Sequence, residues 1–239
     1  MNSPSAKARL AGILYVVMGV PAWFSLMYVP ERLVVRGDAA ATARNIMAAE
    51  SLYRLGILSE VVSQITFLFL ALVLYDLFAD VDRKNARLLV TLVAVGVAIE
   101  ILNCLNLVAP LILLSGADYL SAFTRPQLET LALAFLRLRS GGVNLVSVLW
   151  GLWLFPFGVL VIKSGFFPRL LGVLLIAACV AYVANSIAYI VVPVRPPVVS
   201  TVALTVGGIG EWATVLWFLV KGAKLVPVPA APSRPAYAN

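Results

Sequence analysis

The sequence of 239 residues contains no histidine. Histidine is the commonest general base near neutral pH and the commonest zinc ligand in proteins. Its absence excludes Ser-His and Cys-His nucleophilic pairs and any metal site built on imidazole. We therefore do not expect a hydrolase of ordinary design, and only chemistry carried by carboxylates stays open.

Charged residues and cysteines are also scarce. Only 12% of the residues are charged and 62% are hydrophobic, whereas soluble domains average roughly 25% charged residues. The two cysteines, Cys104 and Cys179, lie inside apolar runs, so we expect small buried side chains and no disulfide framework. The composition predicts an integral membrane protein.

Several partner and cofactor classes find no support in the sequence. The net charge is +7, but no basic patch with interleaved aromatic residues accompanies it, so nucleic acid is not an expected partner. There is no phosphate loop, no cluster with metal-ligand spacing and no dinucleotide fingerprint, so we expect no cofactor and no metal. Membrane lipids are the partners that the composition implies.

Six apolar runs are long enough to cross a hydrocarbon core of about 30 Å as helices. We expect them at Leu10–Val29, Leu55–Phe78, Leu88–Leu114, Val143–Ile162, Leu170–Val192 and Val198–Val220. Pro21 is expected to kink the first. Residues 1–224 would then form one membrane domain, and the proline-rich residues 225–239 a disordered tail.

Two connections between the spans carry amphipathic helix patterns. In the first, Asp38 is a good N-cap, Ala39, Ala43, Ile46 and Met47 recur at helical spacing, and Glu50 can pair with Arg54 four residues later. In the second, Thr124 and Gln127 read as a capping box before an apolar stripe at Leu128, Leu131, Ala132, Phe135 and Leu138. The predicted fold class is an all-α polytopic membrane bundle of six transmembrane helices plus two outer amphipathic helices.

The distribution of positive residues predicts the topology. Six spans place both termini on one side, where ten lysines and arginines lie in tails and very short loops, against eight mostly in longer connections on the other side. Short loops rich in Lys and Arg stay in the cytoplasm. We expect a multipass protein of the bacterial inner (plasma) membrane with both termini cytoplasmic.

Four segments carry a resemblance to a known family. They are Gly37–Ile57, SGADYLSAF at Ser115–Phe123, SGFFPRLLGVLL at Ser164–Leu175, and the Gly210–Gly222 ending. In this order they resemble the DUF4386 family of bacterial multipass membrane proteins, over roughly Arg9 to Lys224. The resemblance implies the fold and topology but no reaction, because the family has no known function.

The resemblance also bears on individual residues. Glu60 and Glu211 match acidic positions of the family. The family often has histidine near positions 139 and 189 and an acid near 185, where this chain has Arg139, Tyr189 and Asn185. These departures weaken the case for chemistry based on a histidine and a carboxylate.

Polar residues inside the predicted spans are the candidate site. They are expensive in hydrocarbon and need a partner, a proton or a water-filled cavity. By depth, Glu60 is expected about 9 Å below the outer surface, and Glu100 and Glu211 near the middle of the membrane. The candidate ligand-binding residues are Glu60, Gln64, Glu100, Asn103, Asn106, Asn144, Asn185 and Glu211.

Two interpretations of these residues stay open. In the first, they form an outward-facing polar pocket, with the amphipathic helices as its rim, that binds or transports a small or amphipathic molecule, which makes the protein transporter-like. In the second, they only tie helices together in a structural or regulatory membrane partner without a ligand. A further alternative is a carboxylate-based enzyme that modifies lipids. No catalytic residue is assigned, and ligand identity and oligomeric state are left open.

Overall fold

The computed structural model describes residues 3–192 and 197–223, and within these ranges the chain forms helices and no strand. Six helical segments are long and apolar enough to cross a membrane: Pro4–Leu33, Glu50–Phe78, Arg83–Leu113, Arg125–Ser164, Arg169–Val191 and Val198–Val220. These segments confirm the all-α bundle with six spans. The predicted disordered tail at 225–239 lies outside the described residues.

The first span contains two proline-associated changes of helix geometry. It consists of α1 (Pro4–Trp23), the π-helical turn η1 (Phe24–Tyr28) and α2 (Val29–Leu33). Pro21 lies inside α1, and Pro30 follows η1. Proline cannot donate the backbone bond to the residue four positions earlier, and a widened turn before Pro30 accommodates this loss. The span bends without ending.

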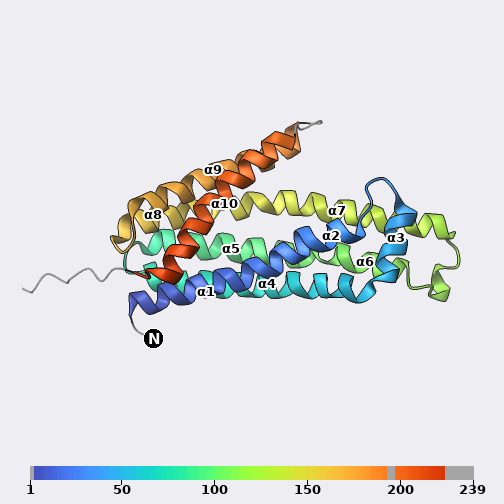
Figure 1. Ribbon diagram of the computed structural model, residues 1–239, viewed down its shortest axis with the longest axis horizontal. Coiled ribbons are helices and arrows are strands. Elements are labelled where there is room, and N and C mark those ends of the chain that lie inside the picture. The colour runs from blue at the N-terminus through green and yellow to red at the C-terminus, as the bar shows by residue number, and fades with distance from the viewer. Residues whose placement is uncertain (1–2, 193–196, 224–239) are drawn as a thin grey trace, which may run out of the picture.

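The predicted amphipathic helix after Asp38 is present as α3 (Ala39–Ala48). Asp38 caps it by accepting from the Ala41 amide at 2.8 Å. Ala43 and Ile46 of the predicted stripe are buried together with Thr42, whereas Met47 is exposed. The helix contacts α2, α4 (Glu50–Phe78) and α7 (Arg125–Leu152), and so it covers one end of the bundle rather than extending away from it (Figure 1).

The second predicted amphipathic helix begins where expected but does not end before the next span. Thr124 and Gln127 form the capping box, and α7 then continues without interruption from Arg125 to Leu152. The helix breaks only at Trp153, before α8 (Leu154–Ser164). Pro156 cannot bond to the carbonyl of Leu152, which explains the break at this point.

The remaining helices complete an elongated bundle. They are α5 (Arg83–Asn103), α6 (Leu105–Leu113), the short 3₁₀ turn η2 (Asp118–Leu120), α9 (Arg169–Val191) and α10 (Pro197–Val220). The start of α1 and the end of α10 lie at the same end of the molecule, which we call the termini end (Figure 1). The opposite end, which carries α3 and η2, is called the distal end.

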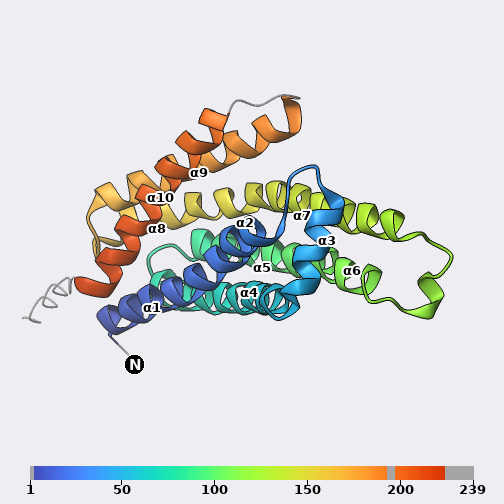
Figure 2. The same ribbon diagram turned by 45° about the vertical axis from the view of Figure 1, so that its right-hand side comes forward.

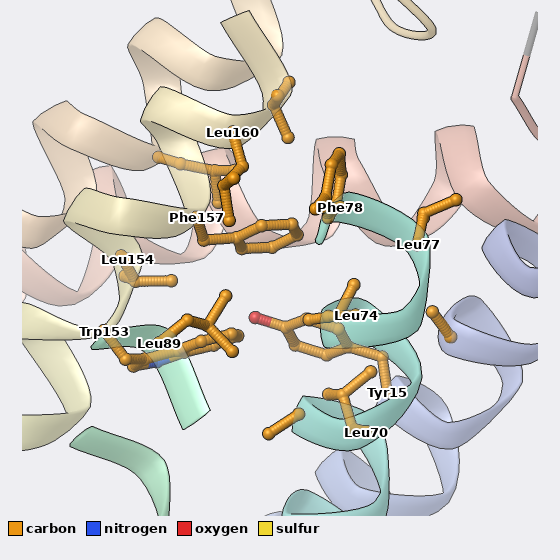
Figure 3. Packing of buried hydrophobic residues seen from close by; sticks show 14 of the residues in the cluster. Tyr15, Leu70, Leu74, Leu77, Phe78, Leu89, Trp153, Leu154, Phe157 and Leu160 are labelled. Atoms are coloured by element: carbon orange, nitrogen blue, oxygen red, sulfur yellow. The ribbon is translucent and has the colours of Figure 1, made fainter. Parts of the chain in front are cut away.

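An aromatic core fills the termini half of the bundle (Figure 3). Trp153 stacks on Phe157 at 5.3 Å between ring centroids and meets the edge of Phe67 at 5.1 Å. Phe157 also contacts Phe78 and Phe218, which brings α4, α8 and α10 together. Burial of such rings contributes strongly to stability, and their edge-to-face contacts add specificity.

One ion pair joins two turns at the termini end. Lys163 Nζ lies 2.6 Å from Asp82 Oδ2, and Asp82 also caps α5 by accepting from the Asn85 amide at 3.1 Å. The hydrogen bond from Lys163, followed by those from Asn85, holds the pKa of the Asp82 carboxyl well below its usual range. Asp82 is therefore ionised at neutral pH and links the α4–α5 turn to the end of α8.

Helices α1 and α10 touch near the termini end and diverge toward the distal end (Figures 1 and 2). A Cβ atom on Gly12 would lie 2.9 Å from Leu219 Cγ, and one on Gly222 would lie 2.5 Å from Ser5 Oγ. Both close approaches involve the first part of α1 and the last part of α10. Toward the distal end, η1 and α10 line a cavity instead of touching at such glycines.

Candidate functional site

A buried arginine on α7 holds together the acidic residues of two other helices. The Nη2 atom of Arg139 lies 2.5 Å from Glu100 Oε1 on α5 and 3.5 Å from Glu60 Oε2 on α4. Both glutamates are 0% exposed and Arg139 is 6% exposed. Buried charges require such partners, because their transfer from water into hydrocarbon is costly. The cluster contains two acids and one base.

Amide side chains extend this cluster. Gln64 Nε2 donates to Glu60 Oε1 at 3.0 Å, one helical turn along α4. Asn103 Nδ2 donates to Glu100 Oε2 at 3.3 Å and to the Arg139 carbonyl at 3.1 Å. Asn106 in turn donates to Asn103 Oδ1 at 3.0 Å. The network fixes α4, α5, α6 and α7 at one level of the bundle.

The network leaves polar atoms without a partner. Among the described residues, Nε and Nη1 of Arg139 and Oε1 of Gln64 are buried and make no hydrogen bond. Buried polar atoms without partners are rare in folded proteins. The cluster therefore has unused hydrogen-bonding capacity, both as donor and as acceptor.

A second polar group surrounds Glu211 on α10. Tyr15 on α1 donates to Glu211 Oε2 at 2.5 Å, and Tyr182 on α9 donates to Glu211 Oε1 at 2.9 Å. Tyr15 belongs to the aromatic core, where its ring lies 6.1 Å from that of Trp153. Glu211 thus joins three helices at the boundary between the aromatic core and the distal half.

A cavity of about 1090 Å³ connects the two polar groups. Gln64 and Arg139 line one part of it, and Tyr182 and Glu211 line another. Most of the remaining wall is apolar; it is formed by Met18, Ala22, Leu26, Met27, Pro30, Val34, Phe67, Leu107, Leu133, Leu136, Val143, Trp150, Trp153 and Leu204. Ligand cavities commonly measure about 300–1,000 Å³ and combine apolar walls with a few polar groups, so this cavity is large enough for a ligand.

The cavity is richest in charge toward the distal end. Arg36 and Arg137 lie in its wall beside Arg139, with Glu31 as the acidic residue at this end. Within the described ranges, neither Arg36 nor Arg137 forms an ion pair. The wall at this end therefore contains three arginines and one glutamate. Glu60 and Glu100 lie behind Arg139, outside the wall, and compensate its charge.

The structure brings together most of the predicted site residues. Glu60, Gln64, Glu100, Asn103 and Asn106 form one network, and the shared Arg139 contact places Glu60 and Glu100 at the same level instead of at two depths. Glu211 belongs to the separate tyrosine group. Asn185 lines the cavity between the two groups.

Asn144 does not join either group. Its side chain donates to the Ser140 carbonyl on its own helix at 2.8 Å, and it is not part of the cavity wall. A backbone carbonyl one turn earlier gives an asparagine inside a helix a local partner, so its presence in a span requires no site.

Arg139, Tyr15 and Tyr182 were not among the predicted site residues. A signal for Arg139 was present, because Ala132, Arg139 and Val146 recur every seven residues and are the buried face of α7. Interpreting Leu128–Leu138 as a separate surface helix hid this periodicity. Tyr15 and Tyr182 carry no comparable signal, because tyrosines in spans usually serve as packing or interface residues.

The described residues contain no group of three or more His, Cys, Asp or Glu side chains that could hold a metal ion. The cysteines are free and buried, as expected from the sequence. What the described residues present at the cavity is hydrogen-bonding groups, charge and apolar surface.

Comparison with known proteins gives one match. The model of a family described as a domain of unknown function, DUF4386, matches residues 10–222. No curated protein and no solved structure is matched.

Proposed function

The chain belongs to the DUF4386 family, and from its cavity we propose that it is a membrane protein that binds or transports a small or amphipathic molecule. The observation that carries this proposal is the cavity of about 1090 Å³ that reaches from charged residues at the distal end to Glu211. Its combination of apolar walls and a few polar groups is typical of sites that bind ligands.

The unpartnered atoms at the cavity wall support the same proposal. Gln64 Oε1 and Trp150 Nε1 are buried without a hydrogen bond among the described residues, and both side chains line the cavity. An acceptor and a donor of this kind are suited to a ligand that carries polar groups. The apolar remainder of the wall suits a ligand with hydrocarbon parts.

We place the distal end outside the cell, in a bacterial inner membrane with both termini in the cytoplasm. The helix ends beside the short turns at the termini end carry Arg83, Lys84, Arg87, Lys163 and Arg169, which favours a cytoplasmic position. The cavity then opens toward the outer leaflet and the outer surface.

Native mass spectrometry of the detergent-purified protein tests the proposal. We expect a specific small-molecule or lipid adduct on the wild type that is lost in Ser147→Trp, because Ser147 lines the cavity and an indole fills part of its volume. The matched control is Leu145→Trp on the same helix, because Leu145 is exposed and does not line the cavity. It should keep the adduct.

Two results would contradict the proposal. An adduct retained in Ser147→Trp would place the bound molecule elsewhere, on the outer surface of the bundle. The absence of any adduct from wild type and variants, with equal thermal stability, would favour a structural or regulatory membrane partner without a ligand.

A further inference from the structure

We propose that the molecule bound in the cavity is an amphiphile with an anionic headgroup, held by its head at Arg36, Arg137 and Arg139 and by its hydrocarbon tail along α7. This inference rests on the proposed function, since it names the class of ligand for the same cavity. Its three supports are the charges at the distal end, the length of the apolar wall and the divergence of α1 from α10.

The charges at the distal end favour an anion. Arg36 and Arg137 are exposed and, within residues 3–192 and 197–223, have no acidic partner. Arg139 is nine-tenths buried, with Nε and Nη1 unbonded in the described residues. Guanidinium groups bind carboxylates and phosphates through paired hydrogen bonds. Arg36 and Arg137 supply the uncompensated positive charge for such a headgroup, and Arg139 supplies its two unbonded N–H groups.

Glu60 and Glu100 do not remove this preference. Both lie behind Arg139, are 0% exposed and are absent from the cavity wall. They occupy Nη2 of Arg139 and hold the guanidinium in place. An anion in the cavity therefore meets Arg36 and Arg137 first, with Glu31 as the acidic residue near them.

The length of the wall matches a lipid tail. Along α7 the cavity wall begins at Leu133 and continues past Arg139 to Trp153, the residue that follows the helix. At 1.5 Å per residue, the 14 residues between Arg139 and Trp153 cover about 21 Å. One leaflet of the hydrocarbon core measures about 15 Å. This part of the wall is therefore longer than one leaflet of the core, and a head at Arg139 leaves room for an extended hydrocarbon tail that reaches Trp153.

The divergence of two helices gives such a molecule a route from the bilayer. Leu26 and Met27 of η1 lie on one side of the cavity and Leu204 of α10 on the other. The contacts between α1 and α10 that hold Gly12 against Leu219 are near the termini end, and the two helices separate toward the distal end in both views (Figures 1 and 2). Met27 and Leu204 line the cavity and are themselves 53% and 50% exposed, so a lipid tail can enter sideways between them without leaving hydrocarbon.

The experiment measures binding of four radiolabelled probes to the full chain in neutral maltoside micelles. The probes are hexadecanoate, its methyl ester, hexadecyl phosphate and inorganic phosphate. We expect hexadecanoate and hexadecyl phosphate to bind roughly tenfold more tightly than the ester, in line with a few partly exposed charge contacts. Inorganic phosphate should not bind, because it lacks the tail.

Variants separate the headgroup from the tail. Arg36→Gln with Arg137→Gln should reduce the preference for the anionic probes to less than about threefold, and because both side chains are exposed, the fold should persist in gel filtration. The control is Arg44→Gln, an exposed arginine on α3 that does not line the cavity. Ser147→Trp should weaken all three amphiphiles equally.

The outcomes are distinguishable. Equal binding of hexadecanoate and its ester, with both lost in Ser147→Trp, would overturn the anionic headgroup and leave the proposed function standing. Inorganic phosphate that binds or competes as well as the amphiphiles would overturn the role of the tail. A failure of every probe to bind specifically would overturn this inference, and native mass spectrometry would then decide whether the cavity holds a different class of ligand.

Discussion

The buried cluster around Arg139 shows how one side chain can set the arrangement of three spans. Its guanidinium is the one basic group that contacts Glu60 and Glu100 in the part of the chain that the structure describes. Removal of one partner from a buried ion pair leaves an uncompensated charge, which is more costly than the pair is stabilising. The effect of a substitution therefore depends on which member is replaced.

We predict that Arg139→Gln lowers the free energy of unfolding by about 3–5 kcal/mol, because it leaves two buried acids without a base. Glu100→Gln should change it by less than about 1 kcal/mol, because Glu60 and Arg139 then form a balanced pair. Unfolding by SDS in mixed micelles, monitored by circular dichroism, measures both. Arg137→Gln, an exposed neighbour, is the control.

A reversed order, with Glu100→Gln the more damaging variant, would show that the second acid contributes more than its charge. The hydrogen bond that Glu100 accepts from the Asn103 side chain would then be the important contact.

At the scale of single residues, the sequence predicted much of the buried polar network but missed Arg139 at its centre. Glu60 with Gln64, and Glu100 with Asn103 and Asn106, were placed on shared faces by helical spacing alone, and these contacts are present. Arg139 was assigned to the connection before the fourth span because it precedes the apolar run that begins at Val143. The distance between α7 and α4, which makes it a partner of Glu60, is a property of the tertiary structure.

At the scale of helices, glycines allow α9 to lie very close to its neighbours. A Cβ atom on Gly158 of α8 would lie 2.6 Å from the carbonyl oxygen of Gly172 on α9, and one on Gly172 would lie 2.5 Å from that of Gly158. Small residues at such crossings are typical of membrane helices. The sequence indicated close helix packing but could not pair these two glycines.

We predict that Gly158→Ala destabilises the protein by about 1–3 kcal/mol, because the added methyl group meets backbone, which cannot turn aside. Gly208→Ala on α10 is the control, since its Cβ atom would meet only Trp212 Cδ1 at 3.9 Å; it should be neutral or slightly stabilising. The midpoint of thermal unfolding in micelles compares the two. Equal midpoints would contradict the close crossing of α8 and α9.

Helix lengths were harder to predict than helix positions. The fourth span was expected to begin at Val143, yet α7 begins at Arg125. Amphipathic and apolar patterns differ along this helix because its first part contacts α3 and its last part contacts α5 and α9. A change of surroundings along one helix resembles, in the sequence, a boundary between two.

For the whole molecule, the arrangement of the ends is testable by labelling. In a background of Cys104→Ala and Cys179→Ala, both buried positions, we predict that Ser121→Cys at the distal end reacts with a membrane-impermeant maleimide in intact cells. Lys84→Cys at the termini end should react only after permeabilisation. The reason is the concentration of positive residues beside the short turns at the termini end.

Labelling of Lys84→Cys in intact cells, without labelling of Ser121→Cys, would invert the proposed orientation. The cavity would then face the cytoplasmic leaflet. Its residues and dimensions would be unchanged.

The aromatic core closes the cavity on the side of the termini end, and it therefore lies in the path of any molecule that would cross the bilayer through the bundle. Trp153, Phe157 and their neighbours fill the bundle between Glu211 and the termini end. Under the proposed function, a lipid that enters from the leaflet at the distal end would meet these rings and would have to return to the same leaflet. The fraction of the protein that holds a lipid would then depend on the lipid composition of that leaflet. Transfer of the bound lipid to the other leaflet would require the stacked rings to separate.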